Sequence, residues 1–273
     1  MCGFKRSPLG DTNHTPAKCK KPDRLLRILC GQEFFLGRMR CLLLFCFAFC
    51  LPAAAEWHVS GYVGVAHTQA SDLLVNQSAL GTELRFRSVN YSGKSFQAPL
   101  YYGVRGGYFF SGHWGVEAEF THLKVFAIVN QPVHVSGMLN GKAIDAVVPM
   151  DSLVQRFSIS HGVNLLLVNV ALREQLFRDS NHLGRILLNI RLGAGATIPH
   201  PESEILGHVD EHYQTGSPVT QASVGAEFRI FRKLYWTGDY KYTRTRQHVD
   251  VFSGEADSLL RSHHFVTGPV IHF

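Results

Sequence analysis

Cysteine is missing from most of this 273-residue chain, because all six cysteines lie within the first fifty residues. The rest of the sequence therefore cannot form a disulfide framework, a cysteine metal site or a thiol nucleophile. It also contains no Gly-rich phosphate loop, no Gly-x-Ser-x-Gly elbow and no nucleotide-binding fingerprint. These absences exclude several common classes of enzyme.

The basic excess of the chain is also missing from residues 56–273. The net charge is +6, but nine of the 27 Lys and Arg residues and three of the 21 Asp and Glu residues lie within residues 1–55, which leaves eighteen of each sign afterwards. Residues 56–273 are therefore neutral overall and show no basic patch in the sequence, so we expect no nucleic-acid partner.

Residues 1–55 have the composition of a leader. An apolar run over residues 41–51 follows Met39 and ends in a small-residue cleavage site at Ala55, as in a secretory signal peptide. The run is too short to cross a membrane as a helix. We expect a true start at Met39, cleavage after Ala55 and one folded domain over residues 56–273. Residues 1–38 are then an upstream translation artefact or an unusually long front region.

A helical stripe of ten or more residues is also missing after Glu56, where short alternating stretches are separated by Gly, Asn, Asp, Ser and Pro. The clearest hairpin joins residues 101–110 to 114–126. Apolar side chains fall on even positions in both, and a three-residue loop keeps both rows on one face. This register sets Arg105 opposite Glu119 on the other face.

The same alternation predicts eight strands, at residues 57–65, 82–91 with 101–110 as one broken strand, 114–126, 153–172, 185–198, 221–231, 234–245 and 262–273. The connections after the second, fourth and sixth strands are short, and the others are long. The longest, residues 127–152, is expected to contain its own hairpin at Asn140-Gly141, a favoured turn dipeptide.

Short turns at one end and long loops at the other are typical of bacterial outer-membrane barrels. We therefore predict an all-β, eight-stranded antiparallel up-and-down transmembrane β-barrel after an N-terminal signal peptide. It is expected in the bacterial outer membrane as a monomer, with both termini periplasmic, after insertion by the barrel-assembly machinery. A soluble sandwich is the alternative, but it would bury many charges, and unpaired buried charges are costly.

In a barrel the charged face of each strand points into the lumen, which eight strands leave just wide enough for side chains to fill. We expect opposite charges to pair there and to plug the lumen. The predicted lumen charge network consists of Arg105, Glu117, Glu119, Arg191, Glu227, Arg229, Asp239 and Lys241.

Candidate chemistry lies near the long-loop rim. His122 and Lys124 share the parity of the apolar residues of their strand, so we expect them to face lipid near the outer interface and to bind substrate there. A lysine at that depth is tolerated and can contact lipid phosphate. The alternative is an interfacial histidine and a snorkelling lysine without a function.

The predicted catalytic residues are His161, Asn164 and His200. Alternation is lost after His161, and a bulge near Gly162 would re-aim both His161 and Asn164. The predicted ligands of a divalent metal cofactor are His122, His161, His200 and Glu202, because imidazole and carboxylate suit iron, zinc or manganese. Ser158 and Ser160 near His161 would instead suit a serine deacylase.

Four segments resemble a family of bacterial outer-membrane barrels described as lipid A oxidase-like. They are Gly93-Lys94-Ser95-Phe96 with Pro99 to Arg105, Trp114-Gly115-Val116 with Phe120 to Lys124, Ser160 to Leu166, and Gly193 to Ala196 with Pro199 to Glu202. A weaker match is Asp239-Tyr240-Lys241-Tyr242. The expected Pro-Pro before the tyrosine pair is Pro99-Leu100 here.

The resemblance implies oxidation of the proximal glucosamine of lipid A to an aminogluconate with oxygen, and lipid A or lipopolysaccharide as the partner. It supplies no assigned catalytic residues. The alternative function is a non-catalytic barrel of structural or surface-interaction type with a charge-filled lumen. Convergence of the rim residues on one place would favour the enzyme.

Overall fold

The computed structural model describes residues 55–159, 162–179, 184–214 and 216–273. The expected start at Met39 and the signal peptide lie outside these residues. Strand formation begins at Glu56, the first residue of the expected folded domain. Among the described residues, no helix is long and apolar enough to cross a membrane.

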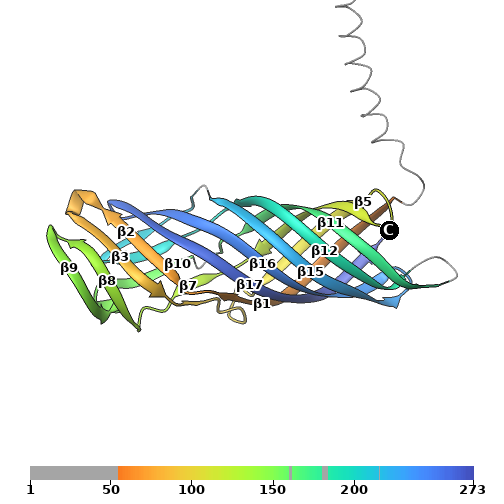
Figure 1. Ribbon diagram of the computed structural model, residues 1–273, viewed down its shortest axis with the longest axis horizontal. Coiled ribbons are helices and arrows are strands. Elements are labelled where there is room, and N and C mark those ends of the chain that lie inside the picture. Colours follow the sequence, from red (N-terminus) through yellow and green to blue (C-terminus); the bar gives the residue numbers. More distant parts are fainter. Residues whose placement is uncertain (1–54, 160–161, 180–183, 215) are drawn as a thin grey trace, which may run out of the picture. The chain divides into compact units, whose positions relative to one another are not determined.

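Within the described ranges, eight strands form a closed antiparallel barrel (Figure 1), because β1 pairs with both β5 and β17. In barrel order they are β1 (Glu56–Thr68), β5 (Tyr102–Phe109), β6 (Trp114–His122), β11 (Leu165–Arg178), β12 (Gly184–Thr197), β15 (Pro218–Phe231), β16 (Leu234–Val251) and β17 (Gly254–His272). The fold is the predicted eight-stranded transmembrane β-barrel of the outer-membrane type.

The two faces of each strand have the predicted character. On β12, Ile190 and Leu192 are 53% and 64% exposed on the outside, whereas Asn189 and Arg191 are buried in the lumen. The same alternation recurs on the other barrel strands. An apolar exterior around a polar interior suits a lipid environment, and the closure of β1 on β17 leaves no edge of the barrel sheet facing the hydrocarbon.

Glu56 and Phe273 lie at the short-turn end of the barrel. Glu56 is paired with Phe109 beside the first short turn, and the Phe273 N–H donates to the Trp57 carbonyl (2.8 Å). The opposite end carries an extension that the sequence did not predict in full. There β2 (Ser71–Gln77), β3 (Thr82–Val89), β8 (Pro132–Leu139) and β9 (Lys142–Pro149) continue the barrel sheet from β17, with short 3₁₀ turns at Ser78–Leu80 and Met150–Ser152.

A second sheet faces this extension and consists of β14 (His208–Glu211), β13 (Glu202–Ile205), β10 (Val154–Ile159), β7 (Val125–Ala127) and β4 (Tyr91–Ser92). Much of the main apolar core is built from these two sheets, including Leu73, Phe86, Val135, Val154 and Ile159. The closed barrel is filled mainly by polar side chains, with a small apolar cluster of Leu187, Tyr235 and Val270, so most of the apolar core lies beyond it.

The structure corrects several strand and connection predictions. Residues 114–126 are not one strand, because β6 ends at His122 and β7 belongs to the second sheet. Residues 82–91 are not the outer part of the second barrel strand, because β3 pairs with β2 and β8 in the extension. Residues 153–172 are not one strand, since β10 and β11 belong to different sheets. The seventh connection is not a long loop, because β16 and β17 continue to a tight turn at Phe252 and Ser253. The hairpin at Asn140-Gly141 is confirmed, with both residues at positive φ.

Candidate functional site

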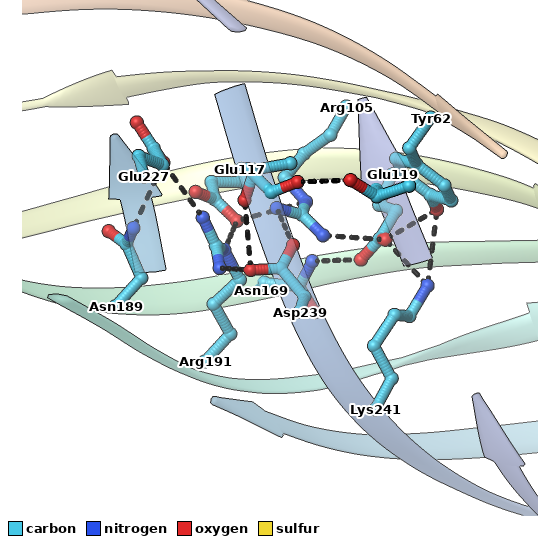
Figure 2. A network of polar contacts seen from close by, with 12 residues as sticks. Tyr62, Arg105, Glu117, Glu119, Asn169, Asn189, Arg191, Glu227, Asp239 and Lys241 are labelled. Carbon is cyan, nitrogen blue, oxygen red and sulfur yellow. Dashed lines mark hydrogen bonds and ion pairs between the residues drawn. The ribbon is translucent and has the colours of Figure 1, made fainter. Parts of the chain in front are cut away.

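The lumen holds one continuous network of buried ion pairs (Figure 2). Arg105 lies opposite Glu119 as predicted, with 3.2 Å between guanidinium and carboxylate, and also contacts Asp239 (3.1 Å) and Glu117 (3.6 Å). Arg191 contacts Glu117 (2.8 Å) from the other side. Each arginine therefore bridges carboxylates from different strands, which ties the barrel wall together across its interior.

Glu119 is the most heavily bonded carboxylate of this network. Its Oε1 accepts from Lys241 Nζ (2.7 Å), Tyr62 (2.6 Å) and Arg105, while Oε2 accepts from Asn169 (2.8 Å) and Gln221 (2.7 Å). All of these side chains are buried. Such complete pairing is what makes a buried charge tolerable.

The predicted lumen charge network lacks three residues of the observed network and includes one residue that does not belong to it. Tyr62, Asn169 and Gln221 were missed because neutral side chains carry no charge signal, although their inward parity could have identified them. Arg229 was wrongly included. It is only partly buried near the short turns and pairs there with Asp179 (2.8 Å).

At the opposite rim, His122 is buried and does not face open lipid as predicted. It keeps the outward parity, but its ring stacks on Tyr102 (5.3 Å between centroids) and its Nδ1 is hydrogen-bonded to Asn164 Oδ1 (2.9 Å). Its Nε2 is buried and has no hydrogen-bond partner among the described residues. The ring is therefore held in place through one nitrogen, and the second nitrogen is buried beside it.

Lys124 is also buried rather than exposed to lipid, with 4% of its surface accessible. Its ammonium donates to the Gln97 carbonyl (2.8 Å) and lies 5.9 Å from the centre of the Phe126 ring. Lys94 lies 4.1 Å from the same ring. Within the described residues, neither lysine has a carboxylate within 4.0 Å, so both ammonium groups lie near one aromatic ring without a direct ion-pair partner.

The segment 162–164 joins this group to the next strand. Gly162 (φ +103°) and Asn164 (φ +46°) redirect the chain where a bulge was predicted. The Val163 N–H donates to the Leu123 carbonyl (2.6 Å), and the His200 N–H approaches the Gly162 carbonyl (3.4 Å). This crossing explains why the strand breaks, and it brings the neighbourhoods of His122 and His200 together.

His200, Glu202 and Glu211 form a second group in which the candidate ligand atoms all lie within 4.8 Å of one another. His200 is buried, packs against Tyr213 (4.2 Å between centroids) and lies 3.8 Å from Glu211. One imidazole and two carboxylates form a donor set that suits a divalent ion. The donor atoms therefore fit the expected metal chemistry.

The predicted ligand set is changed by this geometry. Glu211 joins it, because the hairpin of β13 and β14 places it beside Glu202, a long-range pairing that spacing alone could not reveal. His122 does not belong to the group that shares one ligand position. His161 and Ser160 lie outside the described residues.

We call His122, Lys124, Asn164, His200, Glu202 and Glu211 the rim group. Two hollows flank this group on the outer face. A cavity of about 490 Å³ lies over the second sheet and is lined by Lys94, Phe126, Asn130, Arg156, Ser158 and Glu202. A groove of about 480 Å³ lies on the apolar exterior and includes Val104, Ala118, Phe120, Leu166 and Val168. Ala118 and Phe120 of β6 line the groove, and Phe126 of β7 lines the cavity, so His122 lies between the two hollows in sequence.

No protein-family model and no curated protein matches the chain. Among solved structures, the chain is similar to outer membrane protein OprG from Pseudomonas aeruginosa, at 14% identity and a TM-score of 0.44 over 81% of this chain and 96% of OprG. Neisserial surface protein A (NspA) is similar at 8% identity and a TM-score of 0.37 over 81% and 98%. Ail of Yersinia pestis, solved with a heparin analogue, is similar at 12% identity and a TM-score of 0.32 over 78% and 99%. Likenesses this distant carry no information on activity.

Proposed function

We propose that this protein binds and modifies lipid A in the outer leaflet of the bacterial outer membrane, most specifically by oxygen-dependent oxidation of the proximal glucosamine. The observation that supports this best is convergence. His122 with Lys124, Asn164, and His200 with Glu202 come from three separate segments of the chain and gather on one side of the long-loop rim. A structural barrel has no need to bring such groups together.

The two hollows suit an amphipathic ligand with a phosphorylated sugar headgroup. Lys94 and Arg156 line the cavity together with an amide and an aromatic ring, which are the groups that bind phosphate and sugar. The groove below offers aliphatic side chains to an acyl chain. A lipid bound in this way would place its sugar beside Glu202, which belongs to the cavity and to the His200 group.

The substrate is a lipid A whose proximal sugar has a free anomeric hydroxyl. The oxidation breaks the C–H bond of this hemiacetal carbon and gives a carboxylate: water supplies the added oxygen atom, and O2 takes up two electrons and two protons to become hydrogen peroxide. His200, Glu202 and Glu211 would hold a divalent ion, which would supply Lewis acidity and, if redox-active, a path for electrons. His122 would hydrogen-bond a sugar or phosphate oxygen through Nε2, with Asn164 fixing its ring. Lys124 would attract a lipid phosphate. His161 remains a catalytic candidate from the sequence alone.

The same proposal includes the cellular setting. The protein sits in the outer membrane as a monomer, with its termini in the periplasm and the extension outside, after insertion by the barrel-assembly machinery. The long-loop rim then lies at the level of the outer-leaflet headgroups, where lipid A is found.

A non-catalytic structural barrel is the second candidate, and the lumen network favours it. The buried pairs around Arg105 and Glu119 tie many strands together and provide a stable scaffold with no need for a substrate. Such a barrel would present its extension to partners and leave lipid A unchanged.

Mass spectrometry of lipid A from cells with and without the protein separates these functions. Oxidation predicts an oxygen-dependent mass gain that disappears in His161→Ala and His200→Ala and persists in Ser160→Ala. His208→Ala is the matched control, since this exposed histidine stacks on Phe252 away from the rim group. An unchanged lipid A profile with abundant folded barrel in the outer membrane would establish the non-catalytic reading. Loss of an acyl chain would establish deacylation.

The metal assignment has its own measurement. Purified barrel should bind Mn²⁺, detected by electron paramagnetic resonance, and Glu211→Gln should weaken the binding at least tenfold while heat-modifiable gel migration shows an intact fold. Equal binding by the wild type and Glu211→Gln would remove the metal from the proposal.

A further inference from the structure

Two arginines on neighbouring strands, neither of them part of the His200 group, face each other on the outer surface of the barrel. Arg244 of β16 is the direct cross-strand partner of Arg261 of β17, and both side chains are exposed. Like charges directly opposite one another in an antiparallel pair are destabilising. A natural sequence that places them there points to an anion that offsets the repulsion.

The position of the pair along the barrel indicates what that anion is. Immediately toward the short-turn end, Tyr242 is paired with His263, and the next outward pair is Tyr240 with Phe265. These rings contact one another within each pair. The ring centroids lie 5.2 Å apart in Tyr242 and His263 and 5.3 Å apart in Tyr240 and Phe265. Aromatic rows of this kind mark the membrane–water interface of transmembrane barrels. The arginines therefore lie just beyond the interface, at headgroup depth.

The barrel closes at the same level. The last pair between β1 and β17 is Thr68 with Ser262, one residue from Arg261. Beyond it, β17 pairs with β2 of the extension. The arginine pair thus lies at the upper edge of the closed barrel.

Nearby carboxylates do not neutralise these arginines. A cavity of about 320 Å³ beside the pair is lined by Arg246 and Arg261, together with Arg85, Asp72 and Asp257. Asp72 is already paired with Arg85 (2.6 Å).

Asp257 is held in turn by His248 (3.1 Å). Among the described residues, no ion pair involves Arg244, Arg246 or Arg261. Ser71 and Ser258 also line the cavity, but their hydroxyl groups are hydrogen-bonded to each other and to Tyr91. The guanidinium groups are therefore the donors that can bind a phosphate here.

We infer that Arg244, Arg246 and Arg261 form a binding site for the phosphate groups of an outer-leaflet lipid, separate from the proposed catalytic rim. The inference rests on the outer-membrane orientation proposed above and not on the enzymatic activity. The lipid phosphate sits between the facing guanidinium groups, and its acyl chains lie against the aromatic row below. The site anchors the barrel at a fixed depth in the outer leaflet.

The experiment uses purified barrel in detergent micelles. Binding of lipid A carrying both phosphates, dephosphorylated lipid A and inorganic pyrophosphate is measured by native mass spectrometry. The test variant is Arg244→Ala/Arg261→Ala. The matched control is Arg232→Ala/Lys233→Ala, which removes the same charge from the short turn at the opposite end of β16.

The test variant should bind phosphorylated lipid A at least tenfold more weakly than wild type, and the control should bind it as wild type does. Equal losses in both variants, or none in the test variant, would overturn the site. Equal binding of dephosphorylated lipid A would overturn the phosphate assignment, and pyrophosphate binding as tight as that of lipid A would overturn the lipid assignment. If the wild-type barrel binds lipid A but never oxidises it, the phosphate site stands and only the proposed oxidation is rejected.

Thermal unfolding gives a second readout that a structural role would not produce. Without lipid, Arg261→Ala should raise the unfolding temperature, because it removes a like-charge repulsion. With phosphorylated lipid A added, the same variant should melt below wild type. A lower unfolding temperature under both conditions would show that the arginines are structural. If the alanine variants fail to fold, as judged by heat-modifiable migration, Arg244→Gln/Arg261→Gln replaces them in both assays.

Discussion

Glu119→Gln removes the carboxylate on which Lys241 depends. Lys241 is fully buried, and Glu119 is its only carboxylate partner within 4.0 Å among the described residues. Its remaining acceptors are Tyr62 and Thr121, at 3.1 and 3.0 Å. Arg105 loses one partner too, but it retains Glu117 and Asp239. The substitution therefore leaves one uncompensated cation in the lumen.

The expected costs differ between the two partners. Breaking a buried ion pair by removing one side costs about 3–5 kcal/mol, so we expect that loss in Glu119→Gln. In Lys241→Met, Glu119 keeps Arg105 and its amide donors, and the expected loss is about 1–3 kcal/mol, as for other groups deprived of one hydrogen-bond partner. The double variant contains no stranded ammonium, and it should be more stable than Glu119→Gln alone.

The assay is urea unfolding of the barrel refolded in lipid vesicles, followed by tryptophan fluorescence, with an unchanged dependence on urea as the check on cooperativity. Arg85→Ala is a control, because its pair with Asp72 is exposed and should contribute no more than about 1 kcal/mol. Contacting residues should show a coupling energy of about 0.5–3 kcal/mol. If the losses of Glu119→Gln and Lys241→Met simply add in the double variant, the stranded-charge argument is wrong.

Two further predictions concern the region beyond the barrel. The pKa of Asp72 lies below its ordinary value because a backbone N–H and then Arg85 donate to the carboxylate, so its stabilising effect is present above the ordinary pKa of aspartate and is lost as the pH falls through the lowered pKa. Carbon NMR titration should show a partly restored pKa in Arg85→Ala, and no change would contradict the assignment. Gly162→Ala should cost about 1–3 kcal/mol in thermal unfolding, because φ is +103° and the new methyl would meet His122 at 2.6 Å. Gly141→Ala has positive φ and open space, so an equal loss there would show that the His122 contact is unimportant.

The barrel could be predicted from sequence because period-two alternation determines which face each residue occupies once the strand direction is fixed. The pairing of Arg105 with Glu119 followed from one three-residue turn, and the structure confirms it. The assignment of Arg229 to the lumen charge network was wrong, because parity identifies the face of a strand but not the depth in the barrel. This residue lies beside the short turns.

The extension could not be predicted because its pairings join segments far apart in sequence. Ser258 of β17 is paired with Leu73 of β2, and Glu83 of β3 with Met138 of β8. Charge summed along the chain also concealed the arginine pair, since a neutral total says nothing about which strands become neighbours. His122 kept its outward parity, but no local pattern showed that Asn164 would cover it.

The most direct test of the proposed function reconstitutes purified barrel in nanodiscs with lipid A that lacks the anomeric phosphate, and follows oxygen uptake and lipid A mass together. The account predicts oxygen consumption with a gain of one oxygen atom on the sugar, abolished in His200→Ala and retained in Arg244→Ala/Arg261→Ala when lipid A is confined in the same disc. Folded wild-type barrel that binds lipid A but neither consumes oxygen nor changes its mass would contradict the proposed oxidation.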